Sequence, residues 1–185
     1  SKIIKTKEIK TVLDPTLLLT KKEWENVIIN NKMIESRYIL AYEVEENEEF
    51  VKIANFLSEK TGYKIIHFSQ RNKNRLKNVL FSAYIYGPFD FIHLIRNSEF
   101  VITTSFHATV FSIIFNKKFW TVPHVVTGSR VTDLLKTLNI ESRAIKTLKE
   151  FKTRNYNEPI NYTKVNKALE IEREKSIKWL NNALK

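Results

Sequence analysis

The sequence predicts an α/β domain built around a mainly parallel sheet. Short runs of β-branched and aromatic residues alternate with longer stretches whose apolar residues recur at helical spacing. This alternation is typical of parallel sheets, because the connection between two parallel strands is usually a helix. A chain of 185 residues, of which 43% are hydrophobic, is long enough for one ordinary core. It suits a single domain or one lobe of a larger protein.

The first predicted strand covers residues 37–44 and precedes a helix over about residues 46–60, which Gly62 closes. A second strand is predicted over residues 64–68. Residues 69–77 are polar and cationic without periodicity, which indicates a loop.

Pro88 then favours the start of a helix that runs to about residue 97. The densest pattern follows it: a strand over residues 100–103, a helix over about residues 106–115, and another strand directly afterwards.

The outer parts of the chain give weaker patterns. Residues 13–19 indicate an extended segment for which the sequence shows no obvious packing partner. A short helix is predicted over residues 21–29. Helices are also predicted over about residues 130–138 and 163–184, separated by an irregular stretch at residues 148–159.

Composition excludes several classes of function. The chain has no cysteine, which excludes disulfide scaffolds, cysteine nucleophiles and zinc ribbons. Its 31 Lys and Arg against 20 Asp and Glu give a formal net charge of +11, yet the basic residues are scattered and match no finger, RRM or basic-zipper pattern. We therefore expect no nucleic-acid partner. A Lys-rich, Asn-rich surface or the attraction of a small anionic substrate accounts for the charge.

The helix that follows the strand at residues 100–103 carries the main candidate site. Its start holds Thr104, Ser105 and His107, and helix N-termini after parallel strands bind anions through their free amides and dipole. The hydroxyls can donate to phosphate or carboxylate oxygens, and His107 can hydrogen-bond or protonate the ligand. The alternative is that the hydroxyls only cap the helix and His107 packs on a loop.

Three further residues are candidates for substrate binding. Arg130 stands at a helix start, where a cation is electrostatically misplaced, so an anionic partner is a reasonable expectation. Gly128 beside it suggests a flexible start to that helix. Arg143 follows the same helix, and a surface ion pair with Asp133 or Glu141 is the alternative for both arginines. Asp90 is also a candidate, although its position at a helix start accounts for it without any chemistry.

Several segments stand out in order along the chain: DPTLLL at 14–19, GPFDF at 87–91, VITTSFH at 101–107, FSIIFNK at 111–117, and Ser129-Arg130 with Leu134-Leu135 and Arg143. Together they resemble the C-terminal half of polysaccharide pyruvyl transferases. The resemblance covers roughly residues 10–184. Its most specific part is the stretch around Ser105 and His107, and two positions depart from the family pattern: Ala108, where Gly is usual, and Lys118, where Pro is frequent.

The resemblance implies a fold and an activity. The fold is a three-layer, Rossmann-like domain, the C-terminal lobe of a glycosyltransferase-B-like architecture. Residues 1–13 would then be a linker or the tail of a missing N-terminal lobe, and residues 14–185 the lobe itself. The activity is transfer of pyruvate from phosphoenolpyruvate to a sugar, forming a ketal during bacterial cell-surface polysaccharide synthesis. We expect the isolated chain to be inactive without the other lobe.

The implied chemistry assigns roles to the candidates. His107 would be the catalytic acid, while Thr104, Ser105, Arg130, Arg143 and Asp90 would bind substrate. No cofactor or metal is expected, because phosphoenolpyruvate is the donor substrate. The acceptor would be a sugar or a lipid-linked oligosaccharide, which implies a cytoplasmic protein at the inner face of the membrane. The alternatives are the donor lobe of a nucleotide-sugar glycosyltransferase and a non-catalytic binding module.

Overall fold

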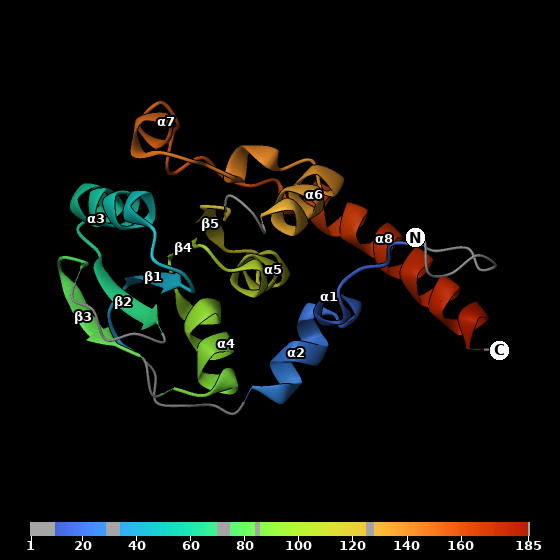
Figure 1. The fold of residues 1–185 in the computed structure, drawn as a ribbon. Coiled ribbons are helices and arrows are strands. Elements are labelled where there is room, and N and C mark those ends of the chain that lie inside the picture. The colour runs from blue at the N-terminus through green and yellow to red at the C-terminus, as the bar shows by residue number, and fades with distance from the viewer. Residues whose placement is uncertain (1–9, 29–33, 70–74, 84–85, 125–127, 185) are drawn as a thin grey trace.

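The computed structural model describes residues 10–28, 34–69, 75–83, 86–124 and 128–184. Within them the strands form one sheet of order β3-β2-β1-β4-β5, and every neighbouring pair is parallel (Figure 1). The predicted α/β fold with a mainly parallel sheet is therefore confirmed. The strands are β1 (Tyr38–Glu43), β2 (Lys64–Ser69), β3 (Val79–Ser82), β4 (Phe100–Thr103) and β5 (Lys118–Thr121).

The described helices include every helix that the periodicity predicts, with ends shifted by one or two residues, and two more. They are α1 (Pro15–Leu18), α2 (Lys21–Val27), α3 (Glu48–Thr61), α4 (Pro88–Asn97), α5 (Phe106–Ile114), α6 (Ser129–Thr137), α7 (Leu148–Lys152) and α8 (Tyr162–Ala183), with a 3₁₀ turn at Glu141–Arg143. Gly62 ends α3 in the left-handed conformation, with φ of 72°, as expected of a glycine cap.

Two predictions about the outer segments are wrong, and side-chain caps explain both. The segment at residues 13–19 is not extended, because the Asp14 carboxylate accepts from the Thr16 amide and begins α1. The stretch at residues 148–159 is not wholly irregular, because the Thr147 hydroxyl accepts from the Glu150 amide and begins α7.

Helices cover both faces of the sheet, as a parallel sheet requires. Along β1, Tyr38 and Leu40 point into a core shared with α4, α5, α6 and α8. The alternate residues Ile39 and Ala41 point into a second core shared with α3 and α7. All four side chains are buried, and the alternation is that of an extended strand packed on both sides. The result is a three-layer domain.

This layering creates a divergence between two neighbouring strands. After β1 the chain crosses to α3 on one face, whereas after β4 it crosses to α5 on the other (Figure 1). The two strands are paired, with Tyr42 opposite Thr103 near their carboxyl ends. Open α/β sheets bind ligands where adjacent connections diverge in this way, so the topology itself marks the ends of β1 and β4.

The segment before α2 is fixed to the last helix. The Leu13 amide donates to the Ser176 hydroxyl over 3.0 Å, and the Arg173 guanidinium donates to the Leu17 carbonyl over 2.9 Å. Helix α8 is therefore the partner that the sequence does not indicate for residues 13–19. Among the described residues, no helix combines the length and apolar character needed to cross a bilayer.

Candidate active site

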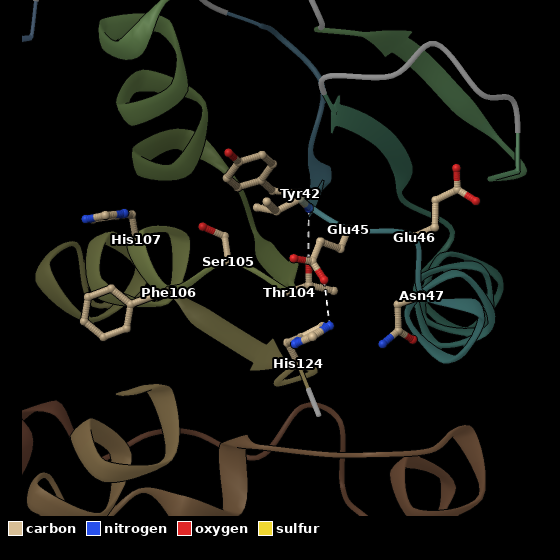
Figure 2. A pocket seen from close by; sticks show the side chains of 10 residues that line it. Tyr42, Glu45, Glu46, Asn47, Thr104, Ser105, Phe106, His107 and His124 are labelled. Atoms are coloured by element: carbon tan, nitrogen blue, oxygen red, sulfur yellow. Dashed lines mark hydrogen bonds and ion pairs between the residues drawn. The ribbon is translucent and has the colours of Figure 1, made fainter. Parts of the chain in front are cut away.

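A hollow of about 310 Å³ opens at the carboxyl ends of β1 and β4, where the topology predicts a ligand site. Its size lies at the lower end of the range for small-molecule pockets. Figure 2 shows polar side chains from three loops around it. The lining residues come from the end of β1 and the loop after it (Tyr42, Val44, Glu45, Glu46, Asn47), from the loop after β4 and the start of α5 (Thr104, Ser105, Phe106, His107), and from the segment after β5 (His124).

Two of the predicted site residues, in the loop after β4, line this hollow. Ser105 is the N-cap of α5, and its hydroxyl accepts from the Ala108 amide over 3.3 Å. The Thr104 hydroxyl accepts from the Val44 amide over 3.0 Å, which ties the loop after β4 to the loop after β1. Each hydroxyl accepts in these contacts, and a hydroxyl also carries one donor hydrogen. Capping and ligand binding are therefore compatible roles.

The other predicted pair, His107 and Arg130, is brought together by an aspartate. His107 Nε2 lies 3.9 Å from one oxygen of Asp14, and Arg130 Nη2 lies 3.0 Å from the other. The Arg130 guanidinium also stacks over the Phe106 ring, 4.1 Å from its centroid. The His107 side chain is 55% exposed, so it is accessible at the rim of the hollow.

Asp14 is a site residue that the sequence reasoning missed. Burial raises the pKa of its carboxyl, but two hydrogen bonds from Thr16 and the charges of His107 and Arg130 outweigh burial and leave that pKa below its ordinary value. Asp14 is therefore an anion at neutral pH. Its place within the DPTLLL segment was the available signal. The ion pair that the described residues give Arg130 is this one, rather than a pair with Asp133 or Glu141.

The structure does not bring Arg143 or Asp90 to the hollow. Arg143 is buried at the edge of the sheet, where the Ile145 amide donates to the Thr121 carbonyl and docks this segment beside β5. The Arg143 guanidinium donates to the Glu158 carbonyl and stacks on Trp120. Asp90 accepts from the Gly87 amide at the start of α4. The contact of Asp90 is that of a helix-start carboxylate, whereas the buried position of Arg143 differs from the surface ion pair that was its alternative.

Glu45 and His124 form a pair that the sequence reasoning also missed. His124 Nε2 lies 2.6 Å from a Glu45 carboxylate oxygen, and a dashed line joins the two in Figure 2. They are distant in sequence, but Glu45 follows β1 and His124 follows β5, so both lie near the carboxyl ends of strands in the same parallel sheet. That shared position was the signal that could have predicted the pair.

Gly128, at the start of α6, lies against His124. Its amide donates to the His124 carbonyl over 2.9 Å, and a Cβ atom at Gly128 would lie 2.3 Å from that carbonyl oxygen. Its φ of −73° is ordinary for any residue. The glycine is thus required for the close approach of its backbone to His124. In the part of the chain that the structure describes, no three His, Cys, Asp or Glu side chains are grouped as a metal ion would need.

The family model for polysaccharide pyruvyl transferase matches residues 1–124, about two thirds of the chain and including both strand ends and His107. The chain belongs to the polysaccharide pyruvyl transferase family. The matched region contains all the residues that line the hollow. Arg130 lies outside it. No match was found among curated proteins.

One solved glycosyltransferase structure shares the fold of this pyruvyl transferase family chain. A glycosyltransferase of kitacinnamycin is similar with a TM-score of 0.52 and 10% identity, over 80% of this chain and 42% of that one. Weaker likenesses are to the glycosyltransferase SnogD from Streptomyces nogalater (TM-score 0.44, 10% identity, 92% of this chain and 42% of that one) and to UDP-GlcNAc 2-epimerase from Neisseria meningitidis (0.40, 13%, 85% and 48%). The chain thus spans less than half the length of each. The predicted GT-B-like, Rossmann-type fold is confirmed by the first likeness and the sheet order.

Proposed function

We propose that this chain binds phosphoenolpyruvate in an enzyme that transfers pyruvate onto two hydroxyls of a sugar, forming a cyclic ketal. The observation that carries the proposal is the meeting of His107, Ser105 and Arg130 around the start of α5, beside the hollow, in a chain of the pyruvyl transferase family. An acid, hydroxyl donors and a guanidinium are the groups that this donor requires.

The reaction defines what each group must do. A proton must reach the methylene carbon of phosphoenolpyruvate, which becomes the methyl group of the ketal and leaves a cationic centre at the neighbouring carbon. Two sugar oxygens form bonds to that carbon, and its bond to the phosphate oxygen breaks. Of the two hydroxyl protons released, one restores the acid and one leaves with the phosphate. The enzyme therefore needs an acid, a base and an anion clamp.

His107 is the proposed acid. It stands in the first turn of α5 at the rim of the hollow, and its Nε2 atom lies 3.9 Å from a carboxylate oxygen of Asp14. Arg130 is the proposed clamp for the carboxylate or phosphate, because a guanidinium presents five donors in a planar fork and Asp14 faces only one of its nitrogens. Thr104 and Ser105 supply hydroxyl donors.

Calorimetry with three ligands tests the donor assignment. We expect the 185-residue chain to bind phosphoenolpyruvate with an affinity that falls as salt rises, because an open site leaves its charges screened. Uridine diphosphate bound more tightly would favour the nucleotide-sugar alternative. Binding of neither ligand, or of inorganic phosphate as tightly as phosphoenolpyruvate, would overturn the proposal.

The acceptor is proposed to be a sugar or a lipid-linked oligosaccharide, which would bring the enzyme to the inner face of the membrane. The full-length protein that contains this chain should form a pyruvate ketal on one member of a panel of β-galactosides and mannosides. Because closure between two lobes excludes water and positions the hydroxyls, the 185-residue chain by itself should show no turnover in the same assay. Robust turnover by this chain would contradict the need for a second lobe.

A further inference from the structure

The two sides of the hollow differ in charge. His107 lies on one side, and Asn47 and Glu46 from the start of α3 lie on the other (Figure 2). Between them lie Glu45 and His124, 2.6 Å apart, so the part of the described lining beyond His107 carries the carboxylates of Glu45 and Glu46. Nothing in the proposed donor chemistry uses these residues.

Their charge makes this side unsuitable for the donor. Phosphoenolpyruvate carries a carboxylate and a phosphate, and two glutamates beside it would repel both. A sugar is neutral and rich in hydroxyls. Carboxylates and amides bind such groups well, because each oxygen can accept from a hydroxyl. The residue types therefore fit a polyhydroxylated ligand.

The proposed reaction also lacks a proton acceptor. An attacking hydroxyl must lose its proton as its oxygen bonds to the cationic carbon, and His107 is assigned to proton donation. A histidine held by a carboxylate suits this task, because the negative charge stabilises the imidazolium that forms. Among the described residues lining the hollow, His124 with Glu45 is a histidine paired with a carboxylate on the side away from His107.

We propose that the Glu45 side of the hollow is the acceptor-sugar subsite, and that His124, positioned by Glu45, removes the proton from the attacking hydroxyl. The inference rests on the proposed function. As the sugar oxygen forms its bond to the central carbon of the donor, its O–H bond breaks and an N–H bond forms at the His124 imidazole. Loss of that proton to the departing phosphate restores neutral His124.

Other titratable groups line the same hollow. They are Tyr42 in β1, Glu46 in the loop after it and His107 in α5. Of these, Tyr42 has a pKa that burial raises, so it stays protonated through the neutral range. A pH profile that changes on replacement of His124 must therefore be compared with one for Glu46→Gln before it is assigned to the pair.

The test uses the full-length enzyme with phosphoenolpyruvate and a p-nitrophenyl galactoside or mannoside that the wild type accepts. For His124→Gln we expect kcat to fall about 10²–10³-fold, within the usual range for a general base. The dissociation constant for phosphoenolpyruvate, measured by calorimetry, should stay within about twofold of wild type. The control is Glu99→Gln, which breaks an exposed ion pair with Arg37 at the amino ends of β4 and β1, opposite the hollow. It should leave both kcat and the dissociation constant unchanged.

Glu45 acts through His124, so its variants need a different readout. Glu45→Gln should lower kcat about tenfold and leave KM for phosphoenolpyruvate close to wild type, because the imidazole loses the carboxylate that orients it. Glu45→Asp should restore part of the rate. A purely structural role would instead lower thermal stability together with kcat, without rescue by Glu45→Asp.

The outcomes separate the two proposals. If the wild type binds no phosphoenolpyruvate or transfers no pyruvate, the proposed function itself fails. If the wild type is active and His124→Gln retains most of its kcat, the base assignment is overturned. Weaker phosphoenolpyruvate binding by His124→Gln, with kcat unchanged, would place the donor on the Glu45 side and overturn the acceptor subsite as well.

Discussion

Helices α3 and α5 begin at the same edge of the sheet, yet they present opposite environments to a ligand. Helix α3 begins at Asn47, whose side chain accepts from the Phe50 amide over 2.9 Å, and its first turn carries Glu48 and Glu49. Helix α5 begins at Ser105, and its first turn carries no acidic residue but has His107. Both follow a parallel strand and face one hollow.

The difference shows that strand order alone does not decide where an anion binds. Helix N-termini carry a partial positive charge, which a carboxylate in the first turn offsets. At α3 two glutamates offset that charge, so little of it remains to attract a ligand. At α5 it remains, with Arg130 nearby. This difference supports the proposed placement of the anionic donor at α5 and of a neutral sugar on the α3 side.

The largest expected effect is on turnover when the α5 side loses its acid. In the full-length protein, His107→Gln should lower kcat by about 10²–10⁴-fold, because the methylene carbon then lacks its proton donor. The side chain is 55% exposed, so the thermal melt should stay close to wild type. Pyruvate incorporation into a sugar acceptor measures the loss.

The matched control for this variant lies at the start of α3. Glu48→Gln replaces a side chain that is 74% exposed and paired with Arg75, so it should leave turnover close to wild type. If a folded His107→Gln protein keeps normal turnover, the acid assignment fails and the functional contrast between the two helices disappears.

A smaller effect is expected on donor affinity from the arginine near α5. Arg130→Lys keeps the charge but removes the planar fork, so phosphoenolpyruvate binding should weaken by about 1–3 kcal/mol. Calorimetry of wild type and variant gives the difference directly. Arg154→Lys serves as the control, because Arg154 forms an exposed ion pair with Glu150 and does not line the hollow. Equal affinities for wild type and Arg130→Lys would reduce Arg130 to a surface ion pair with Asp14.

The sequence predicted the parts of this division that depend on local pattern. Burial on both faces makes β1 and β4 nearly continuous apolar runs, and Ser105 is a local cap, so periodicity and residue type find them. The sequence did not predict strand β3, because Val79–Ser82 is a short edge strand with no fully buried residue. It also did not predict the pairs Asp14 with Arg130 and Glu45 with His124. Each pair joins distant segments, and no local pattern encodes a contact that only the tertiary fold creates.

Local pattern also gave no sign that Arg143 is buried away from the hollow. Arg143 has the same sequence context as a surface or ligand-binding arginine. Its burial against Trp120 follows from the docking of residues 144–145 beside β5, which one sequence does not reveal.

A change at Gly128 should disturb both sides of the hollow together. Gly128→Ala would place a methyl group 2.3 Å from the His124 carbonyl oxygen and 2.8 Å from the Pro123 side chain. Relief of that overlap requires the backbone to move, at a cost of about 1–3 kcal/mol in unfolding free energy. Chemical denaturation measures the cost, and Gly87→Ala is the control, because its nearest contact would be an ordinary 3.7 Å. Equal unfolding free energies for the two variants would mean that the backbone at Gly128 can shift away from His124 without loss of stability.

The smallest expected effect concerns Asp14, which links the α5 side to the start of the chain. Asp14→Asn keeps the shape of the side chain and an oxygen that can cap α1, but it removes the charge, so the ion pair with Arg130 is lost. Loss of such a pair costs up to about 1 kcal/mol of unfolding free energy, and pH tells this electrostatic origin from a packing defect. The pKa of Asp14 is lower in the folded protein than its ordinary value, so its charged form stabilises the fold. That contribution is fully present above the unfolded-state pKa, about 3.9, and is lost as pH falls through the lower folded-state value.

Urea unfolding at neutral pH should therefore show the wild type to be more stable than Asp14→Asn, with the gap in unfolding free energy narrowing below about pH 4. A gap that stays constant down to acid pH would assign the loss to shape, and Asp14 would then no longer be an electrostatic partner of His107 and Arg130.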